Sequence, residues 1–446
     1  MRDVFVSGIG CVTSFGFGVN TLWDALISGR SAATRIPESF RAYHDPISNF
    51  WAPLPSFNWK DFGISRAEEK KFDPLVLMAY VAAQEALEKA ALRPECVNPK
   101  ERRFQLPNVD NHKLGISMGT GMGGGSSPFN NYVPHLLKRH KNLLDAAAET
   151  NPDIVELKNN LEEHPRVNPF VICQTMPNAL AANLAIRYQA LGLVDTACFA
   201  CAASTVAISR AFNAIQMGQI DVAICGGSEY FGDRAGGVFM GFDLLRTLTS
   251  GRGQSDEAAK PFDRHRDGFL FSEGGAGILI LESREHIESR NHLPIAKLVN
   301  TAITNDSTSL VAIDPNNNQI RTMLDQLFQN MEVDRENVKY INSHGTGTIV
   351  NDLVEAEVLS SLFEKDAVVN TTKSLLGHSV GACGAIEAIT TIKSLSDRVA
   401  HPNLNISEPI TDFNFPKEPT SITSKSGVSL NMAFGGHNAS LLFEAV

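Results

Sequence analysis

The stretch VDTACFACAAS, residues 194–204, joins a short β-branched run to an alanine-rich segment and carries two cysteines, Cys198 and Cys201. The run VDTA is typical of a short strand, and the small residues after it predict a helix over 198–217. A strand followed directly by a helix is the repeating unit of α/β proteins. We therefore expect an α/β fold with this pair of cysteines at the start of a helix.

The same alternation of strands and helices continues on both sides of this stretch. Segments typical of buried strands are followed by helix-like segments, which indicates α/β architecture with buried sheets. The predicted strands are 2–10, 113–120, 221–229, 276–282, 294–303, 338–345, 367–374 and 429–436, and the further predicted helices are 20–29, 177–190, 319–331, 351–363 and 381–395.

The order of these elements repeats once along the chain. The polar stretch TLTSGRGQSDEAAKPFD near residues 245–260 separates two sets of similar order. We therefore expect two duplicated halves, residues 1–255 and 256–446. Two insertions interrupt the first half. Residues 93–112 predict an exposed excursion, and residues 133–165 run from a basic to an acidic amphipathic segment, as a surface helical hairpin or a cap near a pocket would.

Length and composition narrow the class of protein. A chain of 446 residues with 43% hydrophobic content can bury a large core. The formal net charge of −10 disfavours binding to nucleic acid and attraction to anionic membranes. No stretch is apolar over the roughly 18 residues that suggest a membrane span, and the first residues do not resemble a signal peptide, so we expect a cytoplasmic protein. The seven cysteines lack the regular spacing of a disulfide framework.

The C-x-x-C of Cys198 and Cys201 has four interpretations. A zinc site needs two further ligands in a second close pair, but the other cysteines stand alone in the sequence. A thioredoxin-like couple also lies at the start of a helix, but early in a small domain. The remaining interpretations are a structural cysteine and a nucleophile whose thiolate the helix N-terminus stabilises. The motif alone does not decide among them.

Two loops in the second half contain residues that suit a cysteine nucleophile. In SHGTGT, His344 follows a predicted buried strand, and Thr346 and Thr348 offer hydroxyl groups to a ligand. In NTTKSLLGHSVGACG, Lys373 follows another strand, and His378 comes five residues later, before a helix of small residues. A lone histidine at a strand end is usually structural. Two such loops together with a helix-starting cysteine indicate an active site.

The chain also resembles a known family over nearly its whole length. Its motifs follow, in order, those of the β-ketoacyl synthases of fatty-acid and polyketide assembly, and the ordered combination is far more specific than any one motif. The resemblance implies the thiolase fold, with two similar βαβαβαββ halves in a five-layered α-β-α-β-α core, usually dimeric, and a pocket between the halves. The motifs are VFVSGIGCVTSFGFGVNTLWDALISGRS, VDTAC, DVAICGGSE, PFDRHRDGFLFSEGGAG, INSHGTGT, NTTKSLLGHSVGACGAIEA and AFGGHNASLLF.

The resemblance implies catalytic roles for five residues. Cys198 matches the acyl-accepting nucleophile of the family, and His344 and His378 match its two active-site histidines. Lys373 matches the lysine that supports the site, and Glu355 matches the acidic residue that pairs with this lysine. Such a carboxylate would keep a buried lysine charged.

The resemblance also implies how the substrate is held. Phe434 in AFGG matches the gatekeeper aromatic, and its backbone N–H and that of Cys198 are expected to form the oxyanion hole. Thr346 and Thr348 are expected to bind a phosphopantetheine arm. Cys201, three residues along the helix, is expected only to pack. We expect no metal and no resident cofactor, because two neutral imidazoles that donate N–H bonds are sufficient.

The implied partner is an acyl carrier protein, which is acidic and delivers thioesters on its phosphopantetheine arm. An acidic enzyme would need a local basic patch to dock it. The residues that match the docking segments of the family are Arg66, Lys70, Lys71, Arg166 and Arg252.

The implied reaction is a decarboxylative Claisen condensation of a cysteine-bound acyl chain with a malonyl group on the carrier protein. The departures AFGG, His437 and FACAAS, with the 133–165 insertion, favour a specialised synthase, such as the ketosynthase subunit of a type II polyketide or aryl-polyene system. It would form a homodimer or pair with a chain-length-factor-like subunit. The alternatives are housekeeping fatty-acid elongation and a non-catalytic chain-length-factor-like role; the retained Cys-His-His set disfavours the second.

Overall fold

Two sheets with the same strand order form the framework of the protein. The computed structural model describes residues 2–42, 44–138, 145, 147–148, 151, 154–155, 167–233, 235–251, 253–329 and 331–446. The first sheet has the order β8 (Val194–Ala197), β7 (Leu114–Gly119), β9 (Val222–Tyr230), β11 (Gly274–Ser283) and β1 (Val4–Thr13). The second has the order β14 (Val368–Asn370), β13 (Tyr340–Asn342), β17 (Ser426–Ala433), β18 (His437–Glu444) and β12 (Ala296–Asn305).

Strand directions repeat as well as strand order. In each sheet the first three strands in this order are parallel, and the last two are antiparallel to their neighbours. The two sheets meet where Val4–Val6 of β1 pairs with Ala296–Leu298 of β12. The predicted duplication of an α/β unit is therefore present in the topology.

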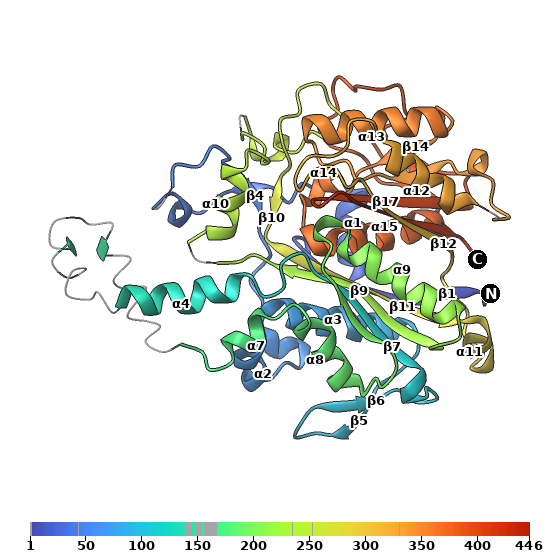
Figure 1. Ribbon diagram of the computed structural model, residues 1–446, viewed down its shortest axis with the longest axis horizontal. Coiled ribbons are helices and arrows are strands. Elements are labelled where there is room, and N and C mark those ends of the chain that lie inside the picture. The colour runs from blue at the N-terminus through green and yellow to red at the C-terminus, as the bar shows by residue number, and fades with distance from the viewer. Residues whose placement is uncertain are drawn as a thin grey trace.

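The helices form three layers around the two sheets (Figure 1). Helices α9 (Ala203–Gln216) and α15 (Cys383–Asp397) pack between the sheets and contact each other. Helices α3 (Pro74–Lys89) and α8 (Ala179–Tyr188) cover the outer face of the first sheet. Helices α12 (Asn318–Phe328) and α13 (Ile349–Leu362) cover the outer face of the second. The result is the five-layered α-β-α-β-α arrangement that the family resemblance implies.

Small residues allow the central helices to approach the strands closely. A Cβ atom at Gly119, the last residue of β7, would lie 2.3 Å from the backbone of Ala203 at the start of α9. Such contacts are too short for any side chain, so glycine is required there. This close approach fixes the N-terminal end of α9, just after Cys201, against the first sheet.

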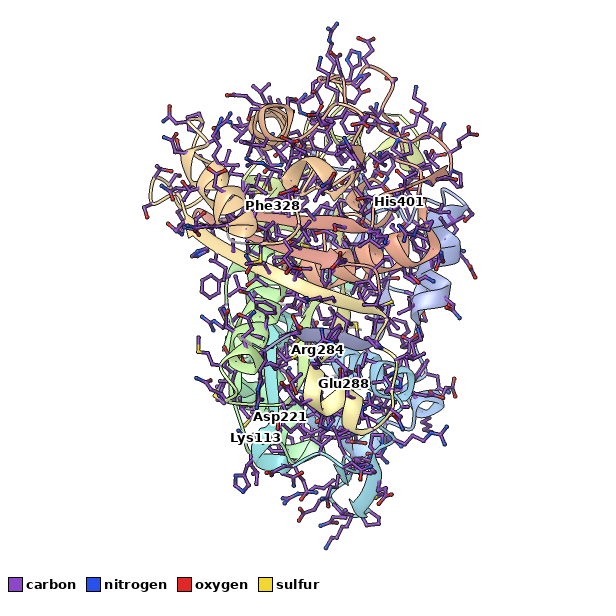
Figure 2. The ribbon with its side chains drawn as sticks, turned by 90° about the vertical axis from the view of Figure 1, so that its right-hand side faces the viewer. Lys113, Asp221, Arg284, Glu288, Phe328 and His401 are labelled. Atoms are coloured by element: carbon purple, nitrogen blue, oxygen red, sulfur yellow. The ribbon has the colours of Figure 1, made fainter. Side chains whose placement is uncertain are left out.

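The boundary between the halves lies later than the sequence predicts. The prediction of 1–255 and 256–446 places β11 in the second half, but β11 pairs with β1 and β9 of the first sheet along its whole length. The repeat therefore divides between β11 and β12. Figure 2 shows the halves one above the other, with Phe328 and His401 in the second and Lys113 and Asp221 in the first.

The remaining elements connect these layers or lie at the surface. The 93–112 excursion contains a small exposed hairpin, as expected for a surface excursion, whereas most of the 133–165 insertion lies outside the described residues. No helix in the described part of the chain is both long and apolar enough to cross a membrane. The connecting elements include β2 (Gly16–Phe17), α1 (Val19–Ile27), β3 (Thr34–Arg35), β4 (Phe50–Ala52), α2 (Arg66–Lys71), β5 (Glu95–Asn98), β6 (Arg103–Gln105), α4 (Ser126–Lys138), α7 (Val171–Thr175), the 3₁₀ turn η4 (Ala200–Ala202), α10 (Gly237–Leu244), β10 (Phe271–Ser272), α11 (Arg284–Ser289), α14 (Lys373–Leu376), the 3₁₀ turn η7 (Val380–Ala382), β15 (Val399–Ala400) and β16 (Thr420–Ser421).

Candidate active site

A pocket of about 300 Å³ lies where the two halves meet and reaches Cys201. Its wall includes Phe242 and Arg246 at the end of α10, the loop after β12, the loop before α13, and the turn between β17 and β18. Five of the predicted site residues line this pocket together with Cys201: His344, Thr346, Thr348, His378 and Phe434. The structure thus brings together side chains that are far apart in the sequence.

Cys201 is the cysteine that faces the histidines. Its Sγ lies 3.0 Å from Nε2 of His378, and both side chains are buried. The backbone N–H groups of Phe434 and of Cys201 itself also contact this sulfur. Burial raises the pKa of the Cys201 thiol to about 12, although the Lys373 ammonium and the Phe434 N–H partly offset this effect. The resting group is therefore a neutral thiol beside a base.

Cys198 does not occupy the predicted nucleophile position. It is exposed, and it does not line the pocket. The helix predicted over 198–217 begins later, because Cys198 and Phe199 have no regular structure and Ala200 turns the chain with a φ of 44°. Cys201, predicted only to pack, instead lies within η4 at the start of the helical segment. The assignment of the nucleophile and of one oxyanion N–H to Cys198 is therefore corrected to Cys201.

His378 is held by its backbone and is neutral. Its N–H donates to the carbonyl of Leu270 at 2.7 Å, and its carbonyl accepts from Ser272. Burial, together with the nearby Lys373 ammonium, holds the pKa of His378 well below its usual range. A neutral imidazole whose Nε2 faces a thiol can accept the thiol proton.

His344 acts as a hydrogen-bond donor in the pocket, whereas His378 acts as an acceptor. Its Nδ1 lies 3.4 Å from the ammonium of Lys373 and 3.4 Å from the amide nitrogen of Asn431. Both of these neighbours are donors, so Nδ1 accepts and the ring proton lies on Nε2. Burial and Lys373 hold the pKa of His344 well below its usual range. His344 is thus a neutral N–H donor in the pocket, 5.6 Å from His378 between ring centroids.

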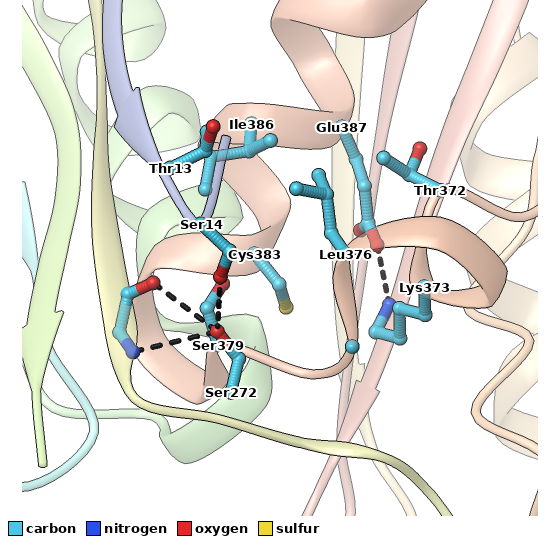
Figure 3. Close-up of a pocket in the computed structure, with 12 residues that line it drawn as sticks. Thr13, Ser14, Ser272, Thr372, Lys373, Leu376, Ser379, Cys383, Ile386 and Glu387 are labelled. Atoms are coloured by element: carbon cyan, nitrogen blue, oxygen red, sulfur yellow. Dashed lines mark hydrogen bonds and ion pairs between the residues drawn. The ribbon is translucent and has the colours of Figure 1, made fainter. Parts of the chain in front are cut away.

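The carboxylate partner of Lys373 is Glu387, not Glu355. The Lys373 ammonium donates to Glu387 and, at 2.8 Å, to the carbonyl of His344. Figure 3 shows this ion pair at the edge of a small polar cavity that Ser272, Ser379 and Cys383 also line. Burial acts to lower the pKa of Lys373. The surrounding acidic groups, of which Glu387 has the largest effect, outweigh burial and raise this pKa above its usual value. Lys373 is therefore charged, as predicted, but the acid that stabilises its charge is Glu387 and not Glu355.

Glu355 instead holds the loop that carries His344. Its two oxygens accept from the backbone N–H groups of His344 at 2.6 Å and Gly345 at 2.8 Å. Asp352, one turn earlier in α13, accepts from the backbone N–H groups of Gly347 and Phe262. Two buried acidic side chains of one helix thus fix the SHGTGT loop, and burial raises the pKa of Glu355 to about 8.

The threonines and the gatekeeper lie where the sequence predicts. Thr346 and Thr348 line the pocket, and their hydroxyl oxygens are 3.0 Å apart. Phe434 lies in the turn between β17 and β18, on the pocket wall. Their roles in binding an arm or gating the pocket stay predictions.

The three predicted docking residues that the structure describes do not line this pocket. Arg66, Lys70 and Lys71 are exposed on α2, and none of them lines the pocket. A capping box of Ser65 and Glu68 stabilises the N-terminus of this helix. Arg166 and Arg252 lie outside the described residues. The docking role of these five residues stays a prediction.

Sequence reasoning missed the parts of the site that tertiary structure creates. These are Cys201 as the thiol in the pocket, Glu387 as the lysine's partner and Asn431 as a donor to His344. For Cys201 a signal existed, because it alone of the two cysteines has alanine on both sides, and a reactive side chain between close backbones needs small neighbours.

Known proteins resemble this chain in structure along its full length. A β-ketoacyl synthase from Burkholderia phymatum superposes with a TM-score of 0.81 at 25% identity and covers 100% of both chains. A type II PKS ketosynthase solved in complex with its acyl-carrier protein superposes with a TM-score of 0.80 at 23% identity, over 100% of this chain and 99% of that one. The fold is therefore that of the thiolase-type ketosynthases.

Sequence comparisons agree with this fold. A chloroplastic 3-oxoacyl-[acyl-carrier-protein] synthase I of Arabidopsis thaliana is 29% identical over 100% of this chain and 87% of its own length. A 3-oxoacyl-[acyl-carrier-protein] synthase 2 of Mycobacterium bovis is 30% identical over 99% of this chain and 96% of its own. The family models for the N-terminal and C-terminal domains of β-ketoacyl synthases match residues 1–286 and 295–407. The chain belongs to the β-ketoacyl synthase family and is an acyltransferase.

Proposed function

We propose that this protein joins an acyl chain held on Cys201 to a malonyl unit carried by an acyl carrier protein, with loss of carbon dioxide. The observation that supports this most directly is the set of groups around Cys201: a base at 3.0 Å in His378, two backbone N–H groups at the sulfur, and a second neutral histidine in the same pocket. These are the groups that thioester exchange and enolate formation require.

The first step loads the acyl chain. His378 Nε2 takes the Cys201 proton as the sulfur attacks the thioester carbonyl, and the N–H groups of Cys201 and Phe434 stabilise the oxyanion. The tetrahedral intermediate expels the carrier thiolate, which takes the proton from His378. The acyl group is then bound to Cys201 as a new thioester.

The second step forms the carbon–carbon bond. The Nε2–H of His344 donates to the carbonyl oxygen of the malonyl thioester, which stabilises the enolate as the carbon–carbon bond to carbon dioxide breaks. The enolate carbon attacks the acyl group on Cys201, the carbon–sulfur bond breaks, and the released Cys201 thiolate takes up a proton that water supplies through Nε2 of His378. Lys373 keeps Nδ1 of His344 an acceptor throughout.

The substrate class we propose is specialised, with type II polyketide or aryl-polyene assembly ahead of housekeeping fatty-acid elongation. The support is the combination of AFGG, His437 and FACAAS with the 133–165 insertion. We further propose an acyl carrier protein as partner, contact of its arm with Thr346 and Thr348, a homodimer or a heterodimer with a chain-length-factor-like subunit, and a cytoplasmic location. The proposed steps require no metal and no resident cofactor, so we expect activity to survive chelation with EDTA.

Intact-protein mass spectrometry after incubation with acyl thioesters tests the proposal. We expect an acyl adduct on wild type and on Cys198→Ala, and none on Cys201→Ala, because only Cys201 has the base and the N–H groups. Cys198→Ala is the matched control, since it removes a thiol three residues away. An adduct that disappears in Cys198→Ala but persists in Cys201→Ala would overturn the assignment. No adduct on wild type with any chain would favour the non-catalytic subunit.

A further inference from the structure

Asn431 on β17 is a fully buried amide that contacts residues of both halves. Its side chain forms hydrogen bonds with Thr205, in the first turn of α9, and with Glu387 on α15. Its nitrogen also lies 3.4 Å from Nδ1 of His344. Strand β17 packs against α15 and against η4, the turn that carries Cys201. One amide thus connects the helix that follows the thiol to a histidine of the opposite half.

The neighbours of the Asn431 amide distinguish its oxygen from its nitrogen. Glu387 forms an ion pair with Lys373, so the second oxygen of this carboxylate can only accept a hydrogen bond (Figure 3). That oxygen lies 2.7 Å from Nδ2 of Asn431, which is therefore the donor. Oδ1 then faces the Thr205 hydroxyl, which must donate because an amide oxygen carries no proton. These two contacts fix the orientation of the amide.

The second N–H of the Asn431 amide is available to His344. Nδ2 carries two hydrogens, and Glu387 accepts one of them. The other has two neighbours, Nδ1 of His344 at 3.4 Å and the sulfur of Cys383 at 3.7 Å. A thiol sulfur is only a weak acceptor, so this hydrogen favours the imidazole nitrogen. Asn431 and Lys373 thus present donors to the same atom of His344.

Lys373 alone holds Nδ1 of His344 only weakly. Its ammonium has two shorter hydrogen bonds, to Glu387 and to the carbonyl of His344. The contact with Nδ1, at 3.4 Å, is the longest of the three. Hydrogen bonds of this length are weak. A second donor at the same atom therefore contributes to fixing the ring and its proton.

We propose that Asn431, oriented by Thr205, is a positioning residue that keeps the ring proton of His344 on Nε2 and acts in decarboxylation but not in acyl loading. This inference rests on the proposed function, in which His344 donates to the malonyl carbonyl. A donor at Nδ1 favours the tautomer that can stabilise the enolate through Nε2–H. Loading uses His378, which faces Cys201, and does not depend on this tautomer.

Separate measurement of the two half-reactions tests the role of Asn431. Wild type and Asn431→Asp are compared in acylation of Cys201 by acetyl-N-acetylcysteamine, and then in release of carbon dioxide from malonyl-N-acetylcysteamine by the acetylated enzyme. The substitution keeps the shape of the side chain but replaces a donor to Nδ1 with an acceptor. We expect release of carbon dioxide to slow by roughly tenfold or more and acylation to stay within about threefold. Equal losses in both half-reactions would overturn the proposal.

Substitutions of Thr205 separate positioning from a general loss of structure. Thr205→Val removes the hydroxyl that orients the amide, so we expect it to slow release of carbon dioxide by about fivefold. Thr205→Ser keeps a hydroxyl and should restore most of the rate. Thr390→Val is the matched control, since Thr390 is a buried threonine of α15 whose hydroxyl donates to the carbonyl of Ile386 at 2.9 Å. Equal rates in Thr205→Val and Thr205→Ser would contradict the role of the hydroxyl.

The tautomer of His344 can be measured without any reaction. In protein labelled with ¹⁵N-histidine, two-bond ¹H–¹⁵N correlation spectra distinguish a protonated ring nitrogen from a bare one, and the signals of His344 are those that vanish in His344→Asn. We expect Nδ1 to be bare in wild type and to gain protonation in Asn431→Asp. This result would support the positioning role even if no malonyl thioester reacts. A protonated Nδ1 in wild type, or an unchanged spectrum in Asn431→Asp, would overturn it.

Discussion

At Cys201, the protein pairs a thiol with a histidine without forming an ion pair. Burial raises the pKa of the thiol to about 12, and burial holds the pKa of His378 well below its usual range. Both groups are therefore neutral near pH 7. The proton moves only when a substrate carbonyl is present to receive the sulfur, which protects the thiol from unspecific reaction.

The pH dependence of alkylation checks this arrangement. We expect the rate at which iodoacetamide modifies Cys201 to rise about tenfold per unit between pH 6 and pH 9, since the thiolate fraction rises so below the pKa. Peptide mass spectrometry on the Cys198→Ala variant measures the rate at Cys201 alone. A plateau below pH 7 would show a thiolate–imidazolium pair and contradict the neutral state.

The residue types of the site could be predicted from the sequence, whereas the only signal for the position of the thiol was the alanine on each side of Cys201. The two histidines and Lys373 follow strands in distinctive loops, and all three lie at the site. The choice between Cys198 and Cys201 depends on where the chain turns, and a φ of 44° at Ala200 leaves no pattern in the sequence. The predicted nucleophile, Cys198, lies three residues before Cys201 and is exposed at the surface.

Among the elements, one strand connects two loops at the site. Glu229 of β9 is buried and accepts from the Thr120 hydroxyl at 3.1 Å and from the Gly121 N–H after β7, and at 3.1 Å from the Gly381 N–H of η7. The first loop belongs to the first half, and η7 follows His378 in the second. Glu229 is thus a positioning residue that fixes His378 relative to Cys201.

The stability of this connection should depend on pH. Burial raises the pKa of Glu229 to about 7, although the N–H donors partly offset it. An acid with a raised pKa in the folded state favours folding at low pH, and this contribution is lost as pH rises towards the folded pKa. We expect the free energy of unfolding of wild type to fall by roughly 3 kcal/mol relative to Glu229→Gln between about pH 4.5 and pH 7.

Urea unfolding at a series of pH values measures this difference. Glu288→Gln is the control, since the Glu288 side chain is 64% exposed and pairs only at the surface with Arg284. A pH-independent difference between wild type and Glu229→Gln would contradict the raised pKa. Glu229→Ala should in addition slow acylation of Cys201, because the two loops lose their shared acceptor.

The sequence predicts most helices and strands but not which of them touch. The resemblance to the family predicts Glu355 as the partner of Lys373. The ammonium reaches Glu387 on α15 instead, while the backbone of the loop takes up both oxygens of Glu355. The partner of a long side chain depends on how the helices and sheets pack against one another. Local sequence patterns do not encode this packing.

At the scale of the whole molecule, β8 is the last strand of the first sheet and leaves one edge unpaired within the described chain. Exposed edges are usually covered, because their N–H and C=O groups otherwise pair with other strands. Val194 on β8 is 41% exposed and Leu191 just before it 60%. This edge is where we expect the second subunit of the proposed dimer to bind.

Light scattering during gel filtration tests the expected dimer. We expect wild type to have twice the 48.4 kDa mass of one chain and Leu191→Asp with Val194→Asp to have the mass of one chain. Leu293→Asp, an exposed leucine away from this edge, should leave the mass unchanged. A double variant that keeps the wild-type mass would place the interface elsewhere, and a wild type with the mass of one chain would favour pairing with a different subunit.

The duplicated architecture could be predicted from the sequence, but the division between its halves could not. The order of elements repeats visibly, and the topology repeats with it. The polar stretch near residues 245–260 looked like a linker, yet it connects α10 to β10 and β11 within the first half. Polar composition marks a surface, and a surface segment need not separate two units.

The repeat extends to one strained turn, which the two halves use differently. Ala200 and Val380 have φ values of 44° and 45°, and they begin η4 and η7, which lead into the equivalent helices α9 and α15. After the first turn stands Cys201. After the second stands Gly381, where a Cβ atom would lie 2.3 Å from the nitrogen of Gly121. One copy of the turn presents a reactive side chain, and the equivalent position of the other copy has none, so that Thr120 and Gly121 of the loop after β7 can approach its backbone. Equivalent turns of the two halves thus have different functions: the first presents the thiol, and the second allows close packing of the backbone.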